Sequence, residues 1–399
     1  MKESYAILDL GTSKITVMIG SRGANNSICI DGIGICDYAG FTDGEWLAPD
    51  KLGAAVEQAV ATAESSARLK INKLYIGVPG DFLLCKVNDV MMSLGKKRRV
   101  LDRDVDALHS QGNEYFDDPE WSVVNIQPIY YVLDDERKLI APVGLTSTRL
   151  GGSISYILAR KSFISLIDAA VAGAGIAETE YVSSPLAEVL FLFDDYKRDN
   201  CVMLADIGAL GTTLAIARGD GICRQYYFSW GGDRITAALC EALDIEPEAA
   251  SALKRKVVLT LSPDYIPPRD DPGGIIQTEY TVVVDNEPIE FDVAEVNAAV
   301  KAEIQTLGRY IEKAFKLCDY DYPDFTALSV TGGGLDIRGA CGYLSDCIGR
   351  DVELLKPRLP LLDKPRLSSA LGLMDMVLSS GSPYSGVAGK FRRLFGKRR

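Results

Sequence analysis

Apolar and polar positions divide the chain into short strand-like runs and longer helix-like segments. Residues 5–11 and 15–21 are apolar runs joined by a short polar turn, which predicts two paired strands. Residues 50–69 are rich in alanine and place valines at helical spacing, which predicts a helix that Asp50 could cap. A further short strand is predicted at 73–80, where it ends in a Pro-Gly turn.

The second half of the chain repeats this opening pattern. Residues 201–222 again read as strand, Asp-x-Gly turn and strand, although few residues are identical to those of the first copy. The further elements predicted there are a helix at 231–243, a hairpin at 279–293 with its turn at Asp285–Asn286, a long helix at 294–318, a strand at 325–337 that runs into three glycines, and a last helix at 368–380.

Residues 83–160 differ from both copies. A basic run there leads into a predicted helix, and strands are predicted at 121–134 and 152–162. This segment is interpreted as a small inserted subdomain. Because the chain has a single histidine, His109, a histidine zinc site and a Ser-His-Asp triad are both disfavoured; His109 falls in the predicted helix and is expected at its surface.

Composition is that of a soluble globular protein with room for two or more lobes. The 399 residues are 47% hydrophobic and 25% charged, and no run of eighteen apolar residues occurs. The nine cysteines are scattered without metal-ligand spacing, and the opening residues lack a signal-peptide layout. A cytoplasmic protein is therefore expected.

Charge is distributed unevenly along the chain. Six of the 43 Lys and Arg residues lie in 390–399, which leaves the remainder with 37 basic and 55 acidic side chains, or −18. Such a body should repel nucleic acid.

On a helix, the apolar residues of the tail share one face, which predicts a membrane-surface helix over 387–399 after a linker at 379–386; the alternative is a disordered basic end. The residues expected to contact lipid are Val387, Phe391, Arg392, Arg393, Leu394, Phe395, Lys397 and Arg398.

Three glycine-containing turns share one chemical logic. In the first two, glycine permits a tight turn whose backbone N–H groups can face an anion, and an aspartate at the end of the strand can hold Mg²⁺ through water; in the third, three glycines leave bare backbone against which a base or ribose can lie. Together they predict a nucleoside triphosphate and a metal ion in a cleft between two lobes. The turns are "LDLGTSK" (8–14), "ADIGALGTT" (205–213) and "VTGGGLD" (330–336).

In this order, the turns resemble the phosphate 1, phosphate 2 and adenosine motifs of the actin/Hsp70/hexokinase superfamily. Within it, the chain resembles the FtsA family of bacterial cell-division proteins. "DLGTSK" (9–14) is similar to that family's opening, "PVGL" (142–145) followed by "TRL" (148–150) to the end of its inserted subdomain, and "GGDRIT" (231–236) to its stretch after phosphate 2. The basic tail resembles its membrane-targeting helix.

The resemblance implies an α/β, actin-like two-lobed fold with duplicated ribonuclease-H-like cores, an inserted small α+β subdomain and a C-terminal amphipathic helix. The implied divisions are the first half of lobe 1 at 1–82, the insert at 83–160, the remainder of lobe 1 at 161–195, lobe 2 at 196–365 with an FtsZ-binding subdomain at 231–300, a helix returning to lobe 1 at 366–378, the linker at 379–386 and the membrane helix at 387–399.

The resemblance also implies a filament-forming protein that binds ATP and Mg²⁺, tethers FtsZ to anionic lipid at the division site and meets later division proteins. Leu210 departs from the family pattern by bringing bulk to the second turn, and Ser251 replaces a glutamate, so at most weak ATPase activity is expected. A PilM-like pilus adaptor and a sugar kinase of the same superfamily remain alternatives.

Asp9 and Asp206 are the candidates to hold Mg²⁺ and position water. The implied cofactor-binding residues are Asp9, Gly11, Thr12, Ser13, Lys14, Asp206, Gly208, Gly211, Thr212, Gly232, Lys254, Gly332, Gly333 and Gly334.

Overall fold

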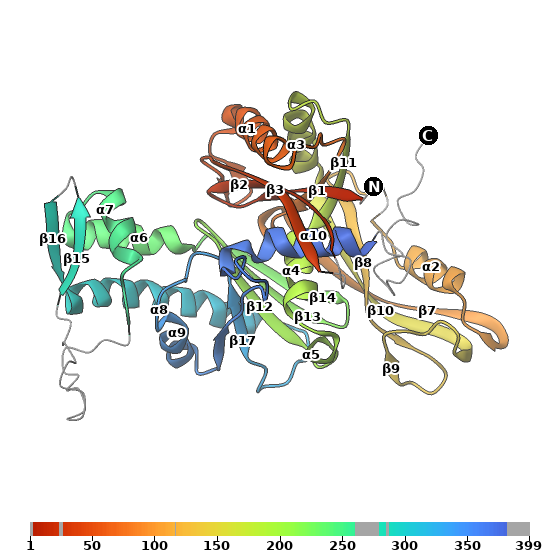
Figure 1. The fold of residues 1–399 in the computed structure, drawn as a ribbon. Coiled ribbons are helices and arrows are strands. Elements are labelled where there is room, and N and C mark those ends of the chain that lie inside the picture. Colours follow the sequence, from red (N-terminus) through yellow and green to blue (C-terminus); the bar gives the residue numbers. More distant parts are fainter. Residues whose placement is uncertain (1–2, 24–26, 116, 260–278, 285–286, 381–399) are drawn as a thin grey trace.

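A computed structural model describes residues 3–23, 27–115, 117–259, 279–284 and 287–380. The chain forms two lobes, each built around a five-stranded sheet, with a third sheet extending from them (Figure 1). The predicted tail helix at 387–399 and the predicted turn at Asp285–Asn286 lie outside the described residues. Within the described ranges, no helix is both long and apolar enough to cross a membrane.

The first lobe is a sheet between two layers of helices. β1 and β2 pair as an antiparallel hairpin, and β6 runs parallel to β1. Because helices cover both faces, Ile7 and Leu8 on adjacent positions of β1 are both fully buried. The sheet order is β11-β6-β1-β2-β3, from β1 (Ser4–Leu10), β2 (Lys14–Arg22), β3 (Ile28–Asp37), β6 (Lys73–Val78) and β11 (Glu178–Ser183).

The helices of this lobe lie in pairs, as Figure 1 shows. On one side are α1 (Pro49–Ala67) and α3 (Lys161–Gly173), and on the other α4 (Ser184–Leu192) and α10 (Ser368–Ser380). The expectation that Asp50 caps α1 is wrong: the helix begins at Pro49 after Ala48, and Asp50 lies inside the first turn. Proline suits that first position because its missing N–H would have no helical partner.

The second lobe repeats the hairpin and the parallel strand. β12 and β13 are antiparallel, and β17 runs parallel to β12. Asp292 caps the long helix α8 by accepting from the Glu295 N–H (3.0 Å). The sheet order is β14-β13-β12-β17-β18, from β12 (Val202–Ile207), β13 (Thr212–Arg218), β14 (Gly221–Phe228), β17 (Leu328–Thr331) and β18 (Val352–Leu354); the larger helices are α6 (Gly232–Leu243), α7 (Pro247–Lys254), α8 (Val293–Leu317) and α9 (Ala340–Ile348).

A two-stranded sheet forms the outer end of this lobe. β15 (Glu279–Val284) and β16 (Glu287–Asp292) pair antiparallel, which confirms the predicted hairpin. Tyr280 and Val282 alternate inward and are buried with the apolar face of α8, while Val283 is 64% exposed. The hairpin is therefore a half-covered surface feature of the second lobe.

The segment between β6 and α3 forms the third sheet and has its own core. Its strands β7 (Leu83–Arg99), β8 (Trp121–Val132), β9 (Lys138–Leu139) and β10 (Thr146–Arg160) lie in the order β7-β10-β8-β9, and α2 (Asp102–Gln111) packs on them. This subdomain also contacts the second lobe, since the Asp220 N–H donates to Pro128 O (3.1 Å) and Ser155 Oγ to Ile222 O (2.7 Å).

His109 is not a surface residue, which corrects the expectation from the sequence. Its side chain is 6% exposed, and its Nε2 lies 2.8 Å from Tyr131 Oη. The reason is tertiary: α2 covers the inserted sheet with the face that carries Val105 and Leu108, and His109 belongs to that face.

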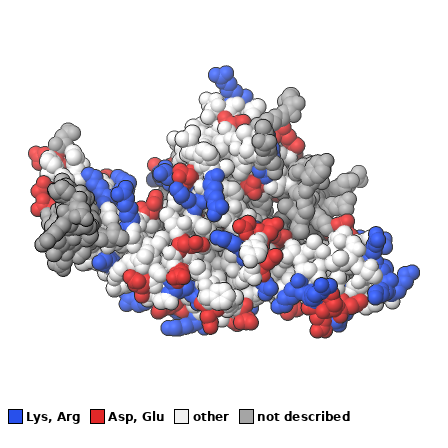
Figure 2. All heavy atoms as spheres, turned by 60° about the horizontal axis from the view of Figure 1, so that its bottom comes forward, with Lys and Arg blue, Asp and Glu red and all other residues white. Residues whose placement is uncertain are grey.

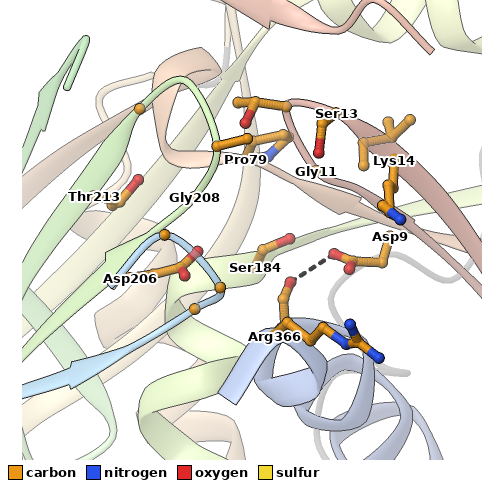
Figure 3. Close-up of a pocket in the computed structure, with 18 of the residues that line it drawn as sticks. Asp9, Gly11, Ser13, Lys14, Pro79, Ser184, Asp206, Gly208, Thr213 and Arg366 are labelled. Atoms are coloured by element: carbon orange, nitrogen blue, oxygen red, sulfur yellow. Dashed lines mark hydrogen bonds between the residues drawn. The ribbon is translucent and has the colours of Figure 1, made fainter. Parts of the chain in front are cut away.

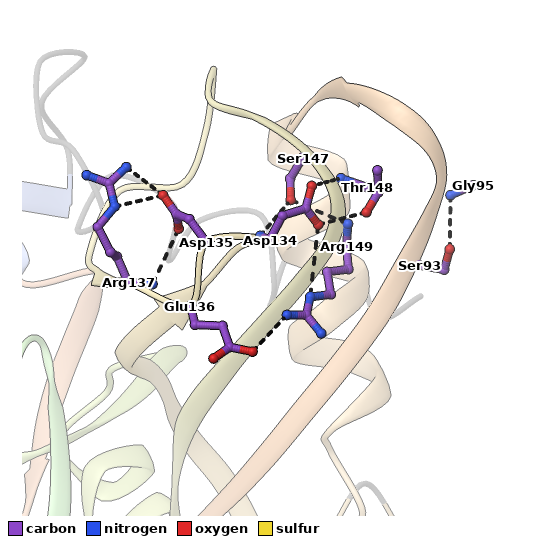
Figure 4. Close-up of polar contacts among 9 residues, drawn as sticks. All are labelled: Ser93, Gly95, Asp134, Asp135, Glu136, Arg137, Ser147, Thr148 and Arg149. Carbon is purple, nitrogen blue, oxygen red and sulfur yellow. Dashed lines mark hydrogen bonds and ion pairs between the residues drawn. The ribbon is translucent and has the colours of Figure 1, made fainter.

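Polar contacts join the segments at the far end of the inserted sheet (Figure 4). Asp134 accepts from the Thr148 N–H (2.8 Å) and from Thr148 Oγ1 (2.7 Å), and Glu136 pairs with Arg149 (3.3 Å). These contacts lie where the pairing of β10 with β7 shifts register between Ser147 and Arg149. They fix the irregular end of the sheet.

Charges of both signs share the surface. Figure 2 shows Lys and Arg side chains interspersed with Asp and Glu over the face drawn. A nucleic-acid backbone would meet carboxylates as well as cations there.

Candidate functional site

Two turns, one from each lobe, face each other at a cavity of about 420 Å³ (Figure 3). The first turn joins β1 to β2 and follows Asp9, and the second joins β12 to β13 and follows Asp206. The Leu210 backbone N–H donates to Thr12 Oγ1 (3.0 Å), so the turns also contact each other directly. The predicted cleft between two lobes is present.

The first turn is closed on itself and held from one side. The Gly11 N–H donates to Lys14 O (3.0 Å), and Tyr38 Oη donates to Gly11 O (2.7 Å). Lys14 Nζ lies 3.3 Å from Asp37 Oδ1, and both side chains are largely exposed. Exposed ion pairs are weak, so Lys14 can exchange this partner for a phosphate at little cost.

The second turn is packed more tightly into its lobe. The Gly208 N–H donates to Gly211 O (2.8 Å), and Gly208 O accepts from the Gly232 N–H (2.9 Å). A Cβ on Gly211 would lie 2.3 Å from Tyr227 Oη, and one on Gly232 would lie 2.6 Å from Gly334 Cα. Packing alone therefore requires glycine at these positions.

Two expectations about the second turn are corrected. Thr212 does not line the cavity: it is fully buried, and its Oγ1 donates to Trp230 O (2.6 Å). Because side chains alternate along β13, Thr213 lines the cavity instead. Leu210, expected to bring bulk against the phosphates, is not a lining residue either; its contribution is the backbone N–H bound by Thr12.

The three glycines after β17 close the other end of the cavity. Gly332 has a φ of +86°, a left-handed conformation that favours glycine, and a Cβ on Gly334 would lie 2.3 Å from Gly208 O. Gly333 is different, since the nearest atom to a Cβ there is Arg366 Cβ at 3.3 Å. Gly333 thus offers backbone against which a flat ring can lie.

Lys254 lines the same end. Its Nζ donates to Gly232 O (2.5 Å), and burial lowers the pKa of its ammonium group. Ser251 does not line the cavity, and its Oγ accepts from Arg255 (2.9 Å). All but one of the predicted cofactor-binding residues therefore meet here: Asp9, Gly11, Thr12, Ser13, Lys14, Asp206, Gly208, Gly211, Gly232, Lys254, Gly332, Gly333 and Gly334.

Besides the exposed Asp233, three carboxylates that are partly or fully buried line the cavity, and the sequence pattern pointed to two of these three. Burial raises the pKa of Asp9 to about 6, although Ser369 Oγ donates to its Oδ1 (2.6 Å) and opposes that rise. Burial and then the charge of Asp9 raise the pKa of Asp206. The third is Glu188, whose pKa is raised by burial and then by the charges of Asp206 and Asp9. Figure 3 shows Asp9 and Asp206 on opposite sides of the cavity.

Glu188 escaped the sequence interpretation because it lies outside the glycine turns. It is on α4, whose first turn is fixed by Pro185 and by Ser183, which accepts from the Leu186 N–H (3.2 Å). Ser184 and Glu188, four residues apart, share the helix face that lines the cavity. One signal was available: Glu188 is the single charge in the otherwise apolar "SPLAEVLFL" (184–192).

This donor set suits a magnesium ion. The charge of Asp9 adds to the raised pKa of Asp206, the charges of both add to that of Glu188, and carboxylate oxygens are the ligands that Mg²⁺ prefers. In the described part of the chain, no group of three or more acidic, histidine or cysteine side chains is arranged to hold a metal directly. The arrangement therefore fits an ion that Asp9 and Asp206 hold through water.

Comparison with known proteins identifies the relationship of the chain. A family model described as "SHS2 domain inserted in FTSA" matches residues 80–158, and the FtsA cell-division protein of Enterococcus hirae is 23% identical over 382 residues, covering 95% of this chain and 84% of that protein. The chain is a relative of FtsA. The FtsA of Bacillus subtilis strain 168 is 22% identical over 375 residues, covering 94% of this chain and 83% of that protein, so the FtsA likeness includes both lobes and the insert.

Solved structures confirm the predicted actin-like fold. The chain superposes on a protein of the PilM–PilN type IV pilus biogenesis complex with a TM-score of 0.62 and 16% identity, covering 95% of this chain and 99% of the other. It superposes on MreB5 of Spiroplasma citri bound to AMPPNP with a TM-score of 0.51 and 12% identity, covering 93% and 95%. At these identities the likeness concerns the fold alone.

Proposed function

We propose that this chain is an actin-like, cytoplasmic cell-division protein that binds ATP with Mg²⁺ between its lobes, forms filaments on the inner face of the cell membrane at the division site and tethers FtsZ there. Two observations support the proposal: the FtsA likeness spans both lobes and the insert, and the cavity brings together residues of all three nucleotide motifs. The partners expected from this role are FtsZ, other copies of the chain, anionic lipids and later division proteins.

The first turn, with its backbone N–H groups and Lys14, is the proposed phosphate site, and the backbone at Gly333 the proposed base site. Asp9 and Asp206 would hold the ion through water, and a bound Mg²⁺ would neutralise phosphate charge. Hydrolysis is expected to be slow, because the Leu210 N–H is already used by Thr12 and is withdrawn from the phosphates. Titration calorimetry with ATP and Mg²⁺, followed by a phosphate-release assay, tests both statements; turnover well above about 1 s⁻¹ would contradict the second.

Membrane attachment is proposed for the tail at 387–399. Its three large apolar side chains, Phe391, Leu394 and Phe395, would insert, while the basic residues would meet anionic headgroups. One copy would bind weakly, and a filament would bind tightly through avidity. In vesicle flotation, Phe391→Asp should abolish binding even at low salt; flotation equal to the unaltered chain would reject the tether.

FtsZ attachment is proposed for 231–300. In its described part, the outer face of the hairpin carries the exposed Val283, with the exposed Glu279 and Glu290 on the same face. This surface would suit a peptide with basic and apolar residues. A pull-down with the FtsZ C-terminal peptide tests it, with Glu279→Lys and Glu290→Lys combined as the charge-reversed variant. Equal capture of the peptide by the unaltered chain and by the variant would mean that FtsZ binds at another surface.

A PilM-like pilus adaptor is the second candidate, and the superposition on the PilM–PilN complex is the observation that favours it. The family match of the insert supports the division role instead. A pilus adaptor would not require anionic vesicles, so the flotation experiment also separates these two functions. Phosphorylation of a soluble sugar would favour the sugar kinase.

A further inference from the structure

Glu188 is a buried carboxylate that the proposed phosphate and metal contacts leave unused. Its side chain lines the cavity and is only 2% exposed. Among the described residues, no hydrogen bond or ion pair to its carboxylate is present, and its strongest charged neighbours are Asp206 and Asp9. Burying an unpaired carboxylate costs free energy, so the position calls for a positive partner.

The basic side chains that line the cavity do not supply that partner. Lys14 Nζ pairs with Asp37 (3.3 Å), and Lys254 Nζ donates to Gly232 O (2.5 Å). Arg366 is exposed at the cavity rim beside Gly333. The three carboxylates therefore share a pocket without a resident cation among the described side chains.

We propose that Glu188 is a third carboxylate of the cation site and that it makes nucleotide binding depend on a divalent cation. The proposal rests on the proposed nucleotide function. Without the ion, the negative phosphates would enter a cavity that already holds three carboxylates, and like charges at close range repel strongly where water is excluded. With the ion, the third carboxylate adds attraction for it through water.

The placement of Glu188 argues against a purely structural role. A structural carboxylate on a buried helix face is normally paired with a cation or with N–H donors. The neighbouring faces of α4 are filled by apolar residues such as Leu186 and Val189, both fully buried. An apolar residue at 188 would complete that packing, whereas Glu188 places a charge beside Asp9 and Asp206.

The test is titration calorimetry of the full chain with ATP, in excess Mg²⁺ and in EDTA, for the unaltered protein, Glu188→Gln and Glu57→Gln. Glu57→Gln is the matched control, because Glu57 is exposed on α1 and outside the cavity. Chelation should weaken ATP binding about 100-fold in the unaltered protein and in the control, but only about tenfold in Glu188→Gln. An equal loss in all three proteins would overturn the proposal. Absence of ATP binding by the unaltered protein with Mg²⁺ would instead refute the nucleotide function and, with it, this inference.

Thermal unfolding without nucleotide gives an independent readout. In EDTA, Glu188→Gln should unfold at a higher temperature than the unaltered protein, because the unpaired charge is gone, and Mg²⁺ should narrow that difference. Glu188→Ala should also respond less to Mg²⁺ than the unaltered protein, whatever its own stability. If both variants are destabilised by the same amount with and without Mg²⁺, Glu188 is a packing residue and the proposal fails.

Discussion

The two turns of the cavity have the same register but different surroundings. Asp9 lies opposite Thr16 in the first hairpin, and Asp206 lies opposite Thr213 in the second. The first turn carries Lys14, and it is held by the hydrogen bond from Tyr38 to Gly11 O and by the ion pair of Lys14 with Asp37. The second carries no basic side chain, and its carbonyls bind the start of α6 while its Leu210 N–H binds the first turn.

This difference shows how one backbone unit, used twice, can take two roles. The paired strands and glycines fix the same turn geometry in both lobes. The contacts around each turn then decide which polar groups remain available. Substitutions in the first turn should therefore weaken nucleotide binding, and substitutions in the second turn should lower the free energy of unfolding.

The largest expected effect tests the first half of that comparison. Asp9→Ala should lower Mg²⁺-dependent ATP affinity by about 100-fold, because it removes a carboxylate that positions the ion. Titration calorimetry measures it, with circular dichroism as the check on folding. Asp37→Ala is the control, since it releases Lys14 and should leave ATP binding intact. An unchanged affinity in a folded Asp9→Ala protein would remove the cleft assignment.

Glycine replacements test the second half. Gly211→Ala should destabilise the protein by about 2–3 kcal/mol, because its methyl group would overlap the Tyr227 ring. Gly11→Ala should cost clearly less, since the nearest atom to its Cβ is Lys14 O at 3.2 Å. Denaturant unfolding compares the two variants. Equal losses would mean that both turns are packed alike.

The raised pKa values of Asp9 and Asp206, one beside each turn, make the stability of the folded protein depend on pH. The folded-state pKa of Asp9 is about 6 and that of Asp206 is also raised, so the folded protein binds more protons than the unfolded chain. Their stabilising contribution is complete below the ordinary value near 4 and is lost as pH rises through the raised values. Without Mg²⁺, stability should fall by about 2 kcal/mol between pH 5 and 8, and Asp206→Asn should flatten this slope. Denaturant unfolding across that pH range in EDTA measures the free energy of unfolding. If the unaltered protein and Asp206→Asn lose stability with pH at the same rate, the raised pKa of Asp206 does not contribute to the pH dependence.

The smallest effect concerns the contact between the turns. Thr12→Val removes the acceptor of the Leu210 N–H and should cost about 1 kcal/mol of stability. Thr12→Ser keeps the hydroxyl and serves as the control. Urea unfolding of both variants measures the difference. A Thr12→Val protein as stable as the control would mean that the turns do not support each other.

Much of the architecture was predictable from the sequence because it depends on local chemistry. Strand-forming runs around "DLGTSK" and "DIGALG" specify the two hairpins, and glycine or aspartate at fixed offsets specifies their turns. The hairpin at 279–293 was equally readable from its alternating residues. The repeat of these units, together with the family resemblance, was sufficient for the actin-like fold, and all but one of the cofactor-binding residues named from the sequence line the cavity.

Only the tertiary structure decided which side chains face the cavity, because that depends on packing between segments distant in the sequence. Glu188 enters the site because α4 lies beneath the two hairpins, and no pattern around residue 188 announces those neighbours. Thr212 points into the core, where its hydroxyl donates to the Trp230 backbone carbonyl, and the next residue, Thr213, therefore points into the cavity. His109 is buried because α2 folds onto a sheet whose strands lie on both sides of it in the sequence. The sequence by itself determined the backbone units and their glycines, whereas burial and electrostatic environment followed from how those units pack.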